Sequence, residues 1–448
     1  MLPEAGGLTR RLSEVVGDEH LLSGPAAGFA VDGAAPSLVV RPGTQEQVQA
    51  VATACAQVGA AIAPWGGGTA VGLGNPPTRL DVVLCLDRLT RIVEFDPANL
   101  VVSAEAGVRL ADLQQVLAAE REFLPLDPAR MDRRTLGGAI ATNASGPSRL
   151  LYGTARDLVL GLRVVLPSGE RVRCGGKVIK NVSGYDMNKV FIGSLGTLGI
   201  ITEVTFKLLP APASRATLAG VFADLPQAAA VLQRTLGSFL LPEAMELLDP
   251  QALAAVASDL GLEGSAGYGM AISLAGSQET VARQVRDFTS LLTEGTALRT
   301  STLGAEASPA AWRKIRDLPD RAIGADRVVV KIGVPISRTA AFLAAAETLG
   351  RRHGWRGAIA AHAASGVVRA AYATGAGAPE VVRDAVEALR REAEAAEGSL
   401  VVEAAPPTLK RHLDAWGKTG EAFAVMRRLK AQFDPRGLMN PGRFLGGI

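Results

Sequence analysis

Apolar and polar positions along residues 37–65 predict a strand, a helix and a second strand. Residues 37–41 (SLVVR) read as a short buried strand. Thr44 with Gln47 three residues later has the spacing of a capping box, and Gly59 supplies a stop, so a helix is expected between them. Residues 60–65 predict the second strand. The apolar stripe of the helix consists of Val48, Val51, Ala52 and Cys55.

This β-α-β unit leads into a glycine-rich run, residues 64–75 (PWGGGTAVGLGN). In Rossmann and P-loop folds the glycine loop opens directly into a helix whose N-terminus meets a phosphate. Here Pro76 and Pro77 follow, and residues 80–86 read as a strand. A phosphate would therefore be held by successive backbone amides of the loop itself, and glycine suits such a nest. Taken alone, the run is equally compatible with a plain loop.

Three more stretches rich in small residues follow in the first half of the chain. They are residues 135–146 (TLGGAIATNASG), 176–186 (GKVIKNVSGYD) and 191–208 (FIGSLGTLGIITEVTFKL). Tight packing of small residues is one interpretation of each. The other is that a flat ring lies close to the main chain, with Thr142, Asn143 and Ser145 as hydrogen-bonding groups. Three such stretches in one chain favour the second interpretation.

The second half changes pattern near residue 212, where segments typical of strands alternate with segments typical of helices. The predicted strands are residues 216–222, 269–274, 328–335 and 358–363. The predicted helices are residues 227–236, 279–292, 339–349 and 380–395, with a last helix at 421–432. This alternation favours a smaller α+β domain of ferredoxin-like units.

Composition excludes several classes of protein. Of 448 residues, 48% are hydrophobic and 20% are charged, which argues against disorder, and a net charge of +3 gives no case for nucleic acid. The three cysteines have no metal-binding spacing, so a reducing compartment is expected, with no iron–sulfur cluster of the chain's own. No signal peptide and no membrane-spanning run is predicted. We expect a cytoplasmic location, with any membrane association through a partner.

The order of these motifs resembles the FAD-binding proteins of the vanillyl-alcohol oxidase (PCMH) type. The likeness is greatest to the flavoprotein subunits of bacterial glycolate oxidase and to D-lactate dehydrogenases. It extends to residues 433–435 (FDP) and 440–443 (NPGR). The resemblance implies an α+β fold with a two-subdomain FAD-binding domain and a ferredoxin-like cap. The implied divisions are an N-terminal helical segment (1–30), the FAD domain (31–211), the cap (212–430) and a return segment (431–448).

The resemblance also implies which residues contact FAD. The glycine loop would cradle the pyrophosphate, residues 135–146 would pass the isoalloxazine and ribityl groups, and residues 199–201 would lie near the adenine. None of the four histidines falls in the glycine loop, so the FAD is expected to be non-covalent. The implied contact residues are Pro64, Trp65, Gly66, Gly67, Gly68, Thr69, Ala70, Pro125, Thr135, Leu136, Gly137, Gly138, Thr142, Asn143, Ser145, Gly146, Gly199, Ile201 and Asn440.

A metal site expected from the resemblance is missing. The 2-hydroxy-acid dehydrogenases of this kind carry His-x-Gly-Asp-Gly-Asn-x-His and Glu-His-Gly motifs, whose side chains hold a divalent metal and supply a base. Here the first motif reads His362 to Arg369 (HAASGVVR), and the second begins at Glu403 but continues with two alanines. Arginine does not ligate metal, and one histidine with one carboxylate is a poor site. We predict no metal, and a packed polar role is the favoured interpretation of His362.

Four side chains remain candidates for facing a substrate: Arg316, Lys331, His362 and Arg369. Arg316 is displaced by one residue from the Trp-x-x-Arg motif it resembles, and surface ion pairs are the alternative for Arg316 and Lys331. Arg369 could replace the metal by binding a carboxylate through two hydrogen bonds.

Three functions follow from these observations. The first is the FAD-containing, E-like subunit of a 2-hydroxy-acid (glycolate or D-lactate) dehydrogenase complex, with a D-type flavoprotein and an iron–sulfur subunit as partners. Leu195, where metal-bearing relatives have Glu, favours it. The second is a self-sufficient FAD enzyme for a hydroxy acid or another alcohol that uses Arg369 and Lys331, with His362 as a further candidate. The third is a non-catalytic scaffold, which has no physical need for a phosphate nest.

Overall fold

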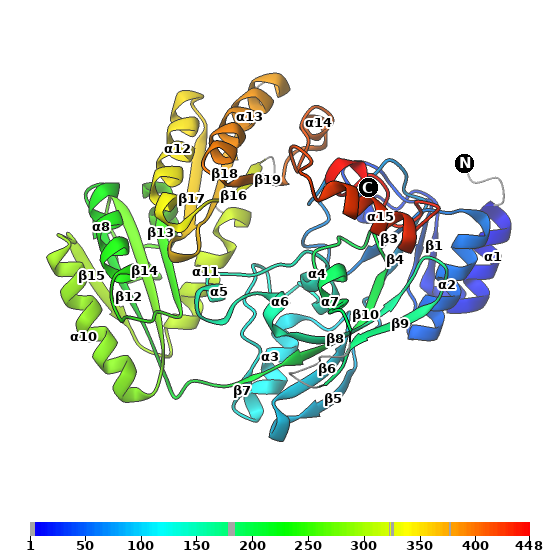
Figure 1. The fold of residues 1–448 in the computed structure, drawn as a ribbon, viewed down its shortest axis with the longest axis horizontal. Helices are drawn as coiled ribbons and strands as arrows, with labels where there is room; N and C mark the ends of the chain where they lie inside the picture. The colour runs from blue at the N-terminus through cyan, green and yellow to red at the C-terminus, as the bar shows by residue number, and fades with distance from the viewer. Residues whose placement is uncertain (1–4, 178–183, 322, 324–326, 376–377) are drawn as a thin grey trace.

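The computed structural model describes residues 5–177, 184–321, 323, 327–375 and 378–448. The chain forms two α+β parts that lie beside each other, on the right and on the left of Figure 1. Each part has its own hydrophobic cores. No helix among the described residues is long and apolar enough to cross a membrane. The domain boundaries inferred from the sequence remain predictions.

A small sheet at the start of the chain carries the glycine loop. Strands β2, β4 and β3 are parallel and β1 is antiparallel at the edge, in the order β1-β2-β4-β3. The predicted β-α-β unit is confirmed: the Thr44 hydroxyl accepts a hydrogen bond from the Gln47 amide at 3.2 Å, and Gly59 ends the helix with φ 69°. The elements are α1 (Ala5–Val16), β1 (Leu21–Ser23), β2 (Leu38–Val40), α2 (Gln45–Val58), β3 (Ile62–Trp65) and β4 (Val82–Cys85).

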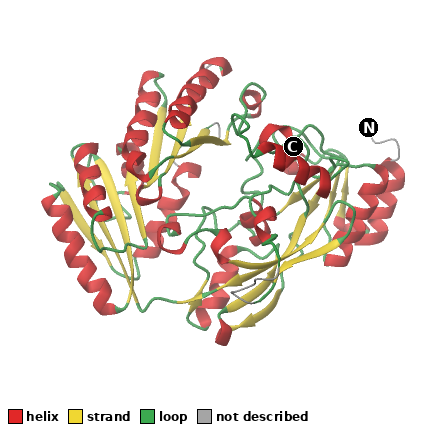
Figure 2. Cartoon of the chain, viewed as in Figure 1, coloured by secondary structure: helices red, strands yellow, loops and turns green. Residues whose placement is uncertain are grey.

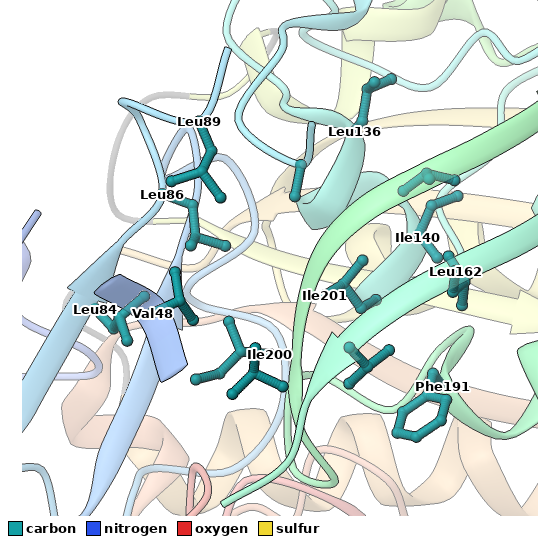
Figure 3. Packing of buried hydrophobic residues seen from close by; sticks show 14 of the residues in the cluster. Val48, Leu84, Leu86, Leu89, Leu136, Ile140, Leu162, Phe191, Ile200 and Ile201 are labelled. Carbon is teal, nitrogen blue, oxygen red and sulfur yellow. The ribbon is translucent and has the colours of Figure 1, made fainter. Parts of the chain in front are cut away.

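A five-stranded antiparallel sheet, in the order β5-β6-β10-β8-β9, completes the right-hand part. Its buried side chains pack with those of the small sheet and of α4 in one core (Figure 3). The elements are β5 (Ile92–Asp96), β6 (Val101–Glu105), α3 (Leu110–Ala119), β7 (Glu122–Phe123), α4 (Leu136–Ala141), α5 (Arg149–Tyr152), α6 (Ala155–Leu158), β8 (Val159–Val165), β9 (Arg171–Gly175), α7 (Asn188–Phe191), β10 (Ile200–Lys207) and β11 (Leu209–Pro210).

The left-hand part is built on one antiparallel sheet of eight strands, in the order β15-β12-β14-β13-β17-β18-β16-β19. Each half repeats the strand order 4-1-3-2 with β-α-β-β-α-β connectivity, which is the ferredoxin-like arrangement. The first half comprises β12 (Ser214–Phe222), α8 (Leu225–Leu236), β13 (Ala244–Leu248), β14 (Tyr268–Gly276), α10 (Gln278–Glu294) and β15 (Arg299–Leu303). The second comprises β16 (Val328–Gly333), α12 (Thr339–Arg352), β17 (Arg356–His362), β18 (Val367–Ala373), α13 (Pro379–Ala395) and β19 (Ser399–Ala404).

Helices cover the two faces of this sheet unequally (Figure 2). Apolar side chains of α8, α10, α12 and α13 pack on one face, and α9 (Pro250–Val256) and α11 (Ser308–Arg321) pack on part of the other. The remainder of the second face carries the polar side chains described below.

The C-terminal segment returns to the glycine-loop sheet after α14 (Pro407–Lys410) and α15 (Phe423–Phe433). The backbone of Ile62 in β3 donates to the Leu438 carbonyl at 2.8 Å and accepts from the Asn440 amide at 2.8 Å. The buried ammonium of Lys430 contacts the Asp434 carboxylate and the Thr197 carbonyl, each at 2.7 Å. These bonds attach the end of the chain to β3 and to the segment that precedes β10.

Replacing Lys430 by Met should destabilise the right-hand part by about 3 kcal/mol, because it leaves the buried Asp434 carboxylate without its cation. Urea unfolding followed by circular dichroism measures the loss. Lys418→Met is the matched control, since the Lys418 side chain is 83% exposed. Equal stability of the two variants would contradict a structural role for Lys430.

Candidate flavin and substrate site

The glycine loop leaves β3 and packs directly on the segment before α4. A Cβ atom at Gly67 would lie 1.7 Å from the Arg133 carbonyl oxygen, and one at Gly66 would lie 2.2 Å from the Thr135 hydroxyl. Gly68 has φ 68°, a conformation that other residues adopt only with strain. Glycine is thus required here for close approach to protein backbone, a reason that the sequence did not show.

The amides on the inner side of the loop are left for a ligand. Within the described part of the chain, the backbone N–H groups of residues 66–70 donate no hydrogen bond, and these residues are half-buried. Unpaired, partly buried amides in a row are costly unless an acceptor reaches them. This arrangement fits the pyrophosphate of FAD.

The next five residues of the loop turn their carbonyls to two buried cations. Arg443 donates to the carbonyls of Val71, Leu73 and Asn75, and Lys410 donates to those of Gly72 and Gly74.

One carboxylate contacts both cations. Asp32 lies 2.6 Å from Arg443 Nη1 and 3.0 Å from Lys410 Nζ. Burial lowers the pKa of both cations and the Asp32 carboxylate opposes that shift. The network fixes residues 71–75 of the loop.

A cavity lies between the glycine loop, α4 and the C-terminal return. Eleven of the predicted contact residues line it: Pro64, Trp65, Gly66, Gly67, Gly68, Thr69, Ala70, Thr135, Gly138, Thr142 and Asn440. Residues that the sequence did not suggest also line it: Val31, Ala63, Val71, Leu73, Ala141, Leu195 and Arg443. The Arg443 Nε donor is buried and has no partner among the described residues, so the wall offers a further group to an anion.

Asn143, at the end of α4, presents a second unpaired group. Its backbone has φ 46°, and its side-chain oxygen is buried without a hydrogen-bond partner in the described chain. Such an acceptor fits an N–H donor of a bound ring. Nearby, a Cβ at Gly146 would lie 1.9 Å from the Asp127 carbonyl oxygen, so Gly146 brings two main-chain segments together.

The other predicted FAD contacts lie behind this surface. The side chains of Leu136 and Ile201 point into the core (Figure 3), and Pro125 is buried. Gly137 and Gly199 are packed on the Ala106 and Val164 side chains, where a Cβ would meet atoms at 2.8 and 2.7 Å. Contact of these five residues and of Ser145 with FAD stays a prediction. Residues 178–183 of the GKVIKNVSGYD stretch lie outside the described chain.

A row of charged and polar side chains crosses the second face of the eight-stranded sheet. Its members are Glu246, His362, Arg369, Lys331 and Glu403, on β13, β17, β18, β16 and β19. In the strand register, Glu246 is the cross-strand partner of His362, and Arg369 is the partner of both Lys331 and Ala360. Cross-strand partners lie on the same face of a sheet, so these side chains share one face. Glu403 shares it because it lies two residues beyond the strand partner of Lys331.

Two separate ion pairs form along this row. His362 Nδ1 lies 2.5 Å from Glu246 Oε1, while Arg369 Nε and Nη2 lie 2.8 and 2.7 Å from Glu403 Oε2. Lys331 Nζ is 3.8 Å from Glu403. Burial opposes ionisation of Glu403, but Arg369, Lys331 and Arg134 together lower its pKa. Glu403 is therefore ionised and surrounded by cations.

The residues present do not fit a metal ion. No group of three His, Cys, Asp or Glu side chains with suitable placement occurs in the described ranges. The resemblance gives Glu403 the position of a metal-binding carboxylate. Here the Arg369 guanidinium is bound to that carboxylate instead. No step of the reaction is therefore assigned to a metal.

Asp127 joins the row to the right-hand part. Its carboxylate accepts hydrogen bonds from the backbone N–H and hydroxyl of Ser148, and Arg316 lies 3.8 Å away. Burial raises the pKa of Asp127, and Arg316 and His362 act against that shift. Arg316 thus binds a protein carboxylate here, and all four candidate side chains lie near the boundary of the two parts.

Glu246, Asp127, Asp32 and Lys410 were missed by the sequence reasoning. The only signal for Glu246 is a single acidic residue in the apolar segment AMELL of β13. No sequence signal pointed to Asp32 or Lys410, because their partners lie hundreds of residues away in the chain.

Gly67→Ala should abolish tight FAD binding, because the added Cβ cannot be placed without moving the loop. We expect a rise in the Kd for FAD of at least about 100-fold, or about 2.7 kcal/mol, measured by flavin fluorescence titration of the apoprotein. Gly72→Ala is the matched control, since a Cβ at Gly72 has no atom within 4 Å. Similar FAD affinity in both variants would refute the loop geometry.

Comparison with known proteins places this site in a family. Residues 36–175 match the family described as FAD binding domain, and residues 211–444, more than half of the chain, match FAD linked oxidases, C-terminal domain.

Glycolate oxidase subunit GlcD of Bacillus subtilis is 30% identical, covering 91% of this chain and 88% of its own length. A D-lactate dehydrogenase of Anaerostipes hadrus is 31% identical, covering 79% and 77%. Glycolate oxidase subunit GlcE of Escherichia coli is 39% identical, but over only 28% and 37%.

Solved structures share the fold at lower identity. p-Cresol methylhydroxylase superimposes with a TM-score of 0.77 at 18% identity, covering 99% of this chain and 97% of its own. Alkyldihydroxyacetonephosphate synthase gives 0.74 at 19% identity, covering 98% and 86%. The predicted α+β, PCMH-type fold is confirmed. The chain belongs to the FAD-linked oxidases and is an FAD-dependent oxidoreductase related to glycolate oxidase subunits and D-lactate dehydrogenases.

Proposed function

We propose that this chain oxidises a 2-hydroxy acid of the glycolate or D-lactate class, using arginine and lysine in place of a metal. The observation that supports this proposal is the Arg369–Glu403 ion pair with Lys331 beside it. Two cations face one carboxylate, and Arg134 of the right-hand part also lowers the pKa of Glu403. Cations gathered at one place suit a substrate carboxylate.

Lys331 is the more available of the two cations. Its side chain is 41% exposed and only distantly paired, whereas Arg369 uses two of its nitrogens on Glu403. We infer that the Lys331 ammonium binds the substrate carboxylate directly and that Arg369 holds Glu403 ionised and in place. This modifies the expectation that Arg369 itself is the carboxylate ligand.

The chain holds FAD chiefly through backbone. The free amides of residues 66–70 bind the pyrophosphate, and Asn143 offers an acceptor to the ring. When bound, FAD accepts the hydride that a hydroxy acid loses on oxidation. The protein's own contribution is to orient the carboxylate, hold the hydroxyl and exclude water.

An E-like subunit within a complex is the second candidate, and the missing metal site favours it. GlcD and GlcE are both named as glycolate oxidase subunits. In this case a D-type flavoprotein and an iron–sulfur subunit would be partners, and the chain would relay electrons. The long alignment with GlcD and the short one with GlcE support the first proposal over this one. A scaffold role is least supported, since unpaired amides have no purpose without FAD.

An anaerobic visible spectrum of the purified chain, before and after adding glycolate or D-lactate, tests the proposal. Bleaching of the flavin bands by either acid is the expected result. Flavin that stays oxidised with the chain alone, but bleaches once the partner subunits are added, would support the E-like role instead. A chain that takes up no FAD would refute both.

Lys331→Met should raise the KM for the acid that bleaches the flavin by about 10-fold to 100-fold, equivalent to about 1.4–2.8 kcal/mol. FAD affinity should be unchanged, because Lys331 does not line the cavity beside the glycine loop. Lys314→Met, which removes an exposed cation paired with Asp259, is the control. An unaltered KM in Lys331→Met would remove Lys331 from the substrate site.

A further inference from the structure

The Glu246–His362 pair is the one part of the polar row that the proposed carboxylate site does not use. The Glu246 side chain is 1% exposed and His362 is 12% exposed. Among the described residues, His362 is the sole hydrogen-bond partner of the Glu246 side chain, at 2.5 Å. The pair was not expected, because the sequence favoured a packed polar role for His362.

Burial of Glu246 dictates where the His362 proton resides. A buried carboxylate needs a donor, and His362 Nδ1 is the atom beside it. Nδ1 therefore carries the proton, which leaves the lone pair of the neutral ring on Nε2. Within the described chain Nε2 has no hydrogen-bond partner, so it is free to accept a proton.

His362 lies at the correct place relative to the carboxylate site. Its strand partner on β18 is Val367, and Arg369 is two residues further along the same face. Such diagonal neighbours are about 7–8 Å apart. A 2-hydroxy acid anchored by its carboxylate beside Arg369 and Lys331 has its hydroxyl on the adjacent carbon, within reach of a side chain at this spacing.

The charges around the pair come from both parts of the molecule. Asp127, before α4, lies close enough for His362 and for Arg316 of α11 to act on its pKa, and Asp127 in turn acts on the pKa of Arg149 of α5. Helix α5 follows residues 135–146, the segment predicted to contact the flavin. It packs against both β13 and the turn after His362. His362 therefore lies where the cap meets the segment predicted to contact the flavin.

We propose that His362 is the proton acceptor for substrate oxidation and that Glu246 is its positioning residue, an inference that rests on the proposed function. The hydroxyl O–H bond of the 2-hydroxy acid breaks and its proton moves to His362 Nε2. The Cα–H bond breaks and its electron pair leaves with the hydrogen as a hydride to FAD. A C=O bond forms, so the substrate becomes a 2-oxo acid while FAD gains two electrons and a proton.

The tautomer is the first test and needs no substrate. Nitrogen NMR of histidine-labelled holoprotein observes four imidazoles, and His362→Asn identifies the signal of His362. We expect a neutral ring protonated on Nδ1, with a strongly downfield Nδ1 proton that disappears in Glu246→Leu. A ring protonated on Nε2 would overturn the proposal, because that nitrogen could then not accept a proton.

The second test is rapid anaerobic mixing with D-lactate and with glycolate, which follows flavin reduction. His362→Asn should slow reduction by about 100-fold or more and Glu246→Gln by about 10-fold, with FAD content and melting temperature unchanged. Glu246→Asp should restore part of the rate. His353→Asn is the matched control, since His353 stacks on Trp355 at the end of α12.

The outcomes separate the two proposals. Normal reduction of wild type, with rates within twofold in both His362→Asn and Glu246→Gln, would overturn the role of the pair and leave the proposed function standing. No reduction of wild type by either acid would overturn the proposed function, and with it the proton-accepting role. Slow reduction confined to the pair variants, with the Nδ1 tautomer observed, supports the proposal.

Discussion

Five consecutive peptide carbonyls of the glycine loop, residues 71–75, point at the buried cations Lys410 and Arg443. Asp32 contacts both, so three distant parts of the chain meet behind one loop. Removing Asp32 would leave the two buried cations side by side without a carboxylate, which costs several kcal/mol. The network fixes residues 71–75, directly after residues 66–70, whose amides donate no hydrogen bond within the described chain.

The eight-stranded sheet of the left-hand part has two unlike faces. Four helices pack on one face. Helices cover only part of the second face, and the rest of it bears five ionisable side chains. Most of these charges are paired with one another, which lowers the cost of placing them on a partly covered face. Lys331 stands out as the exposed cation with the longest ion-pair distance in the row.

We propose that salt bridges stand in place of the metal site that the resemblance gives to related hydroxy-acid dehydrogenases. A divalent cation at such a site orients a carboxylate and acidifies a hydroxyl. Arg369 and Lys331 can supply the first effect, because guanidinium and ammonium groups bind carboxylates. They cannot supply the second to the same degree, so a base with a fixed tautomer becomes more important. The Glu246–His362 pair meets that need.

Local pattern determined much of the molecule. The Thr44–Gly59 helix, the flanking strands, the glycine loop and the absence of three-ligand spacing around His362 all follow from short-range sequence, because caps, periodicity and glycine conformation are local. Strands β13, β15, β18 and β19 were missed, since buried polar residues such as Glu246 and Arg369 interrupt the apolar pattern and β15 is an exposed edge. Residues 136–141 read as a ring-binding stretch and also form a helix. Which carboxylate meets which cation was decided only by the tertiary structure, because Asp32 with Lys410 and Glu246 with His362 are joined by sheet register and domain packing, which no local pattern records.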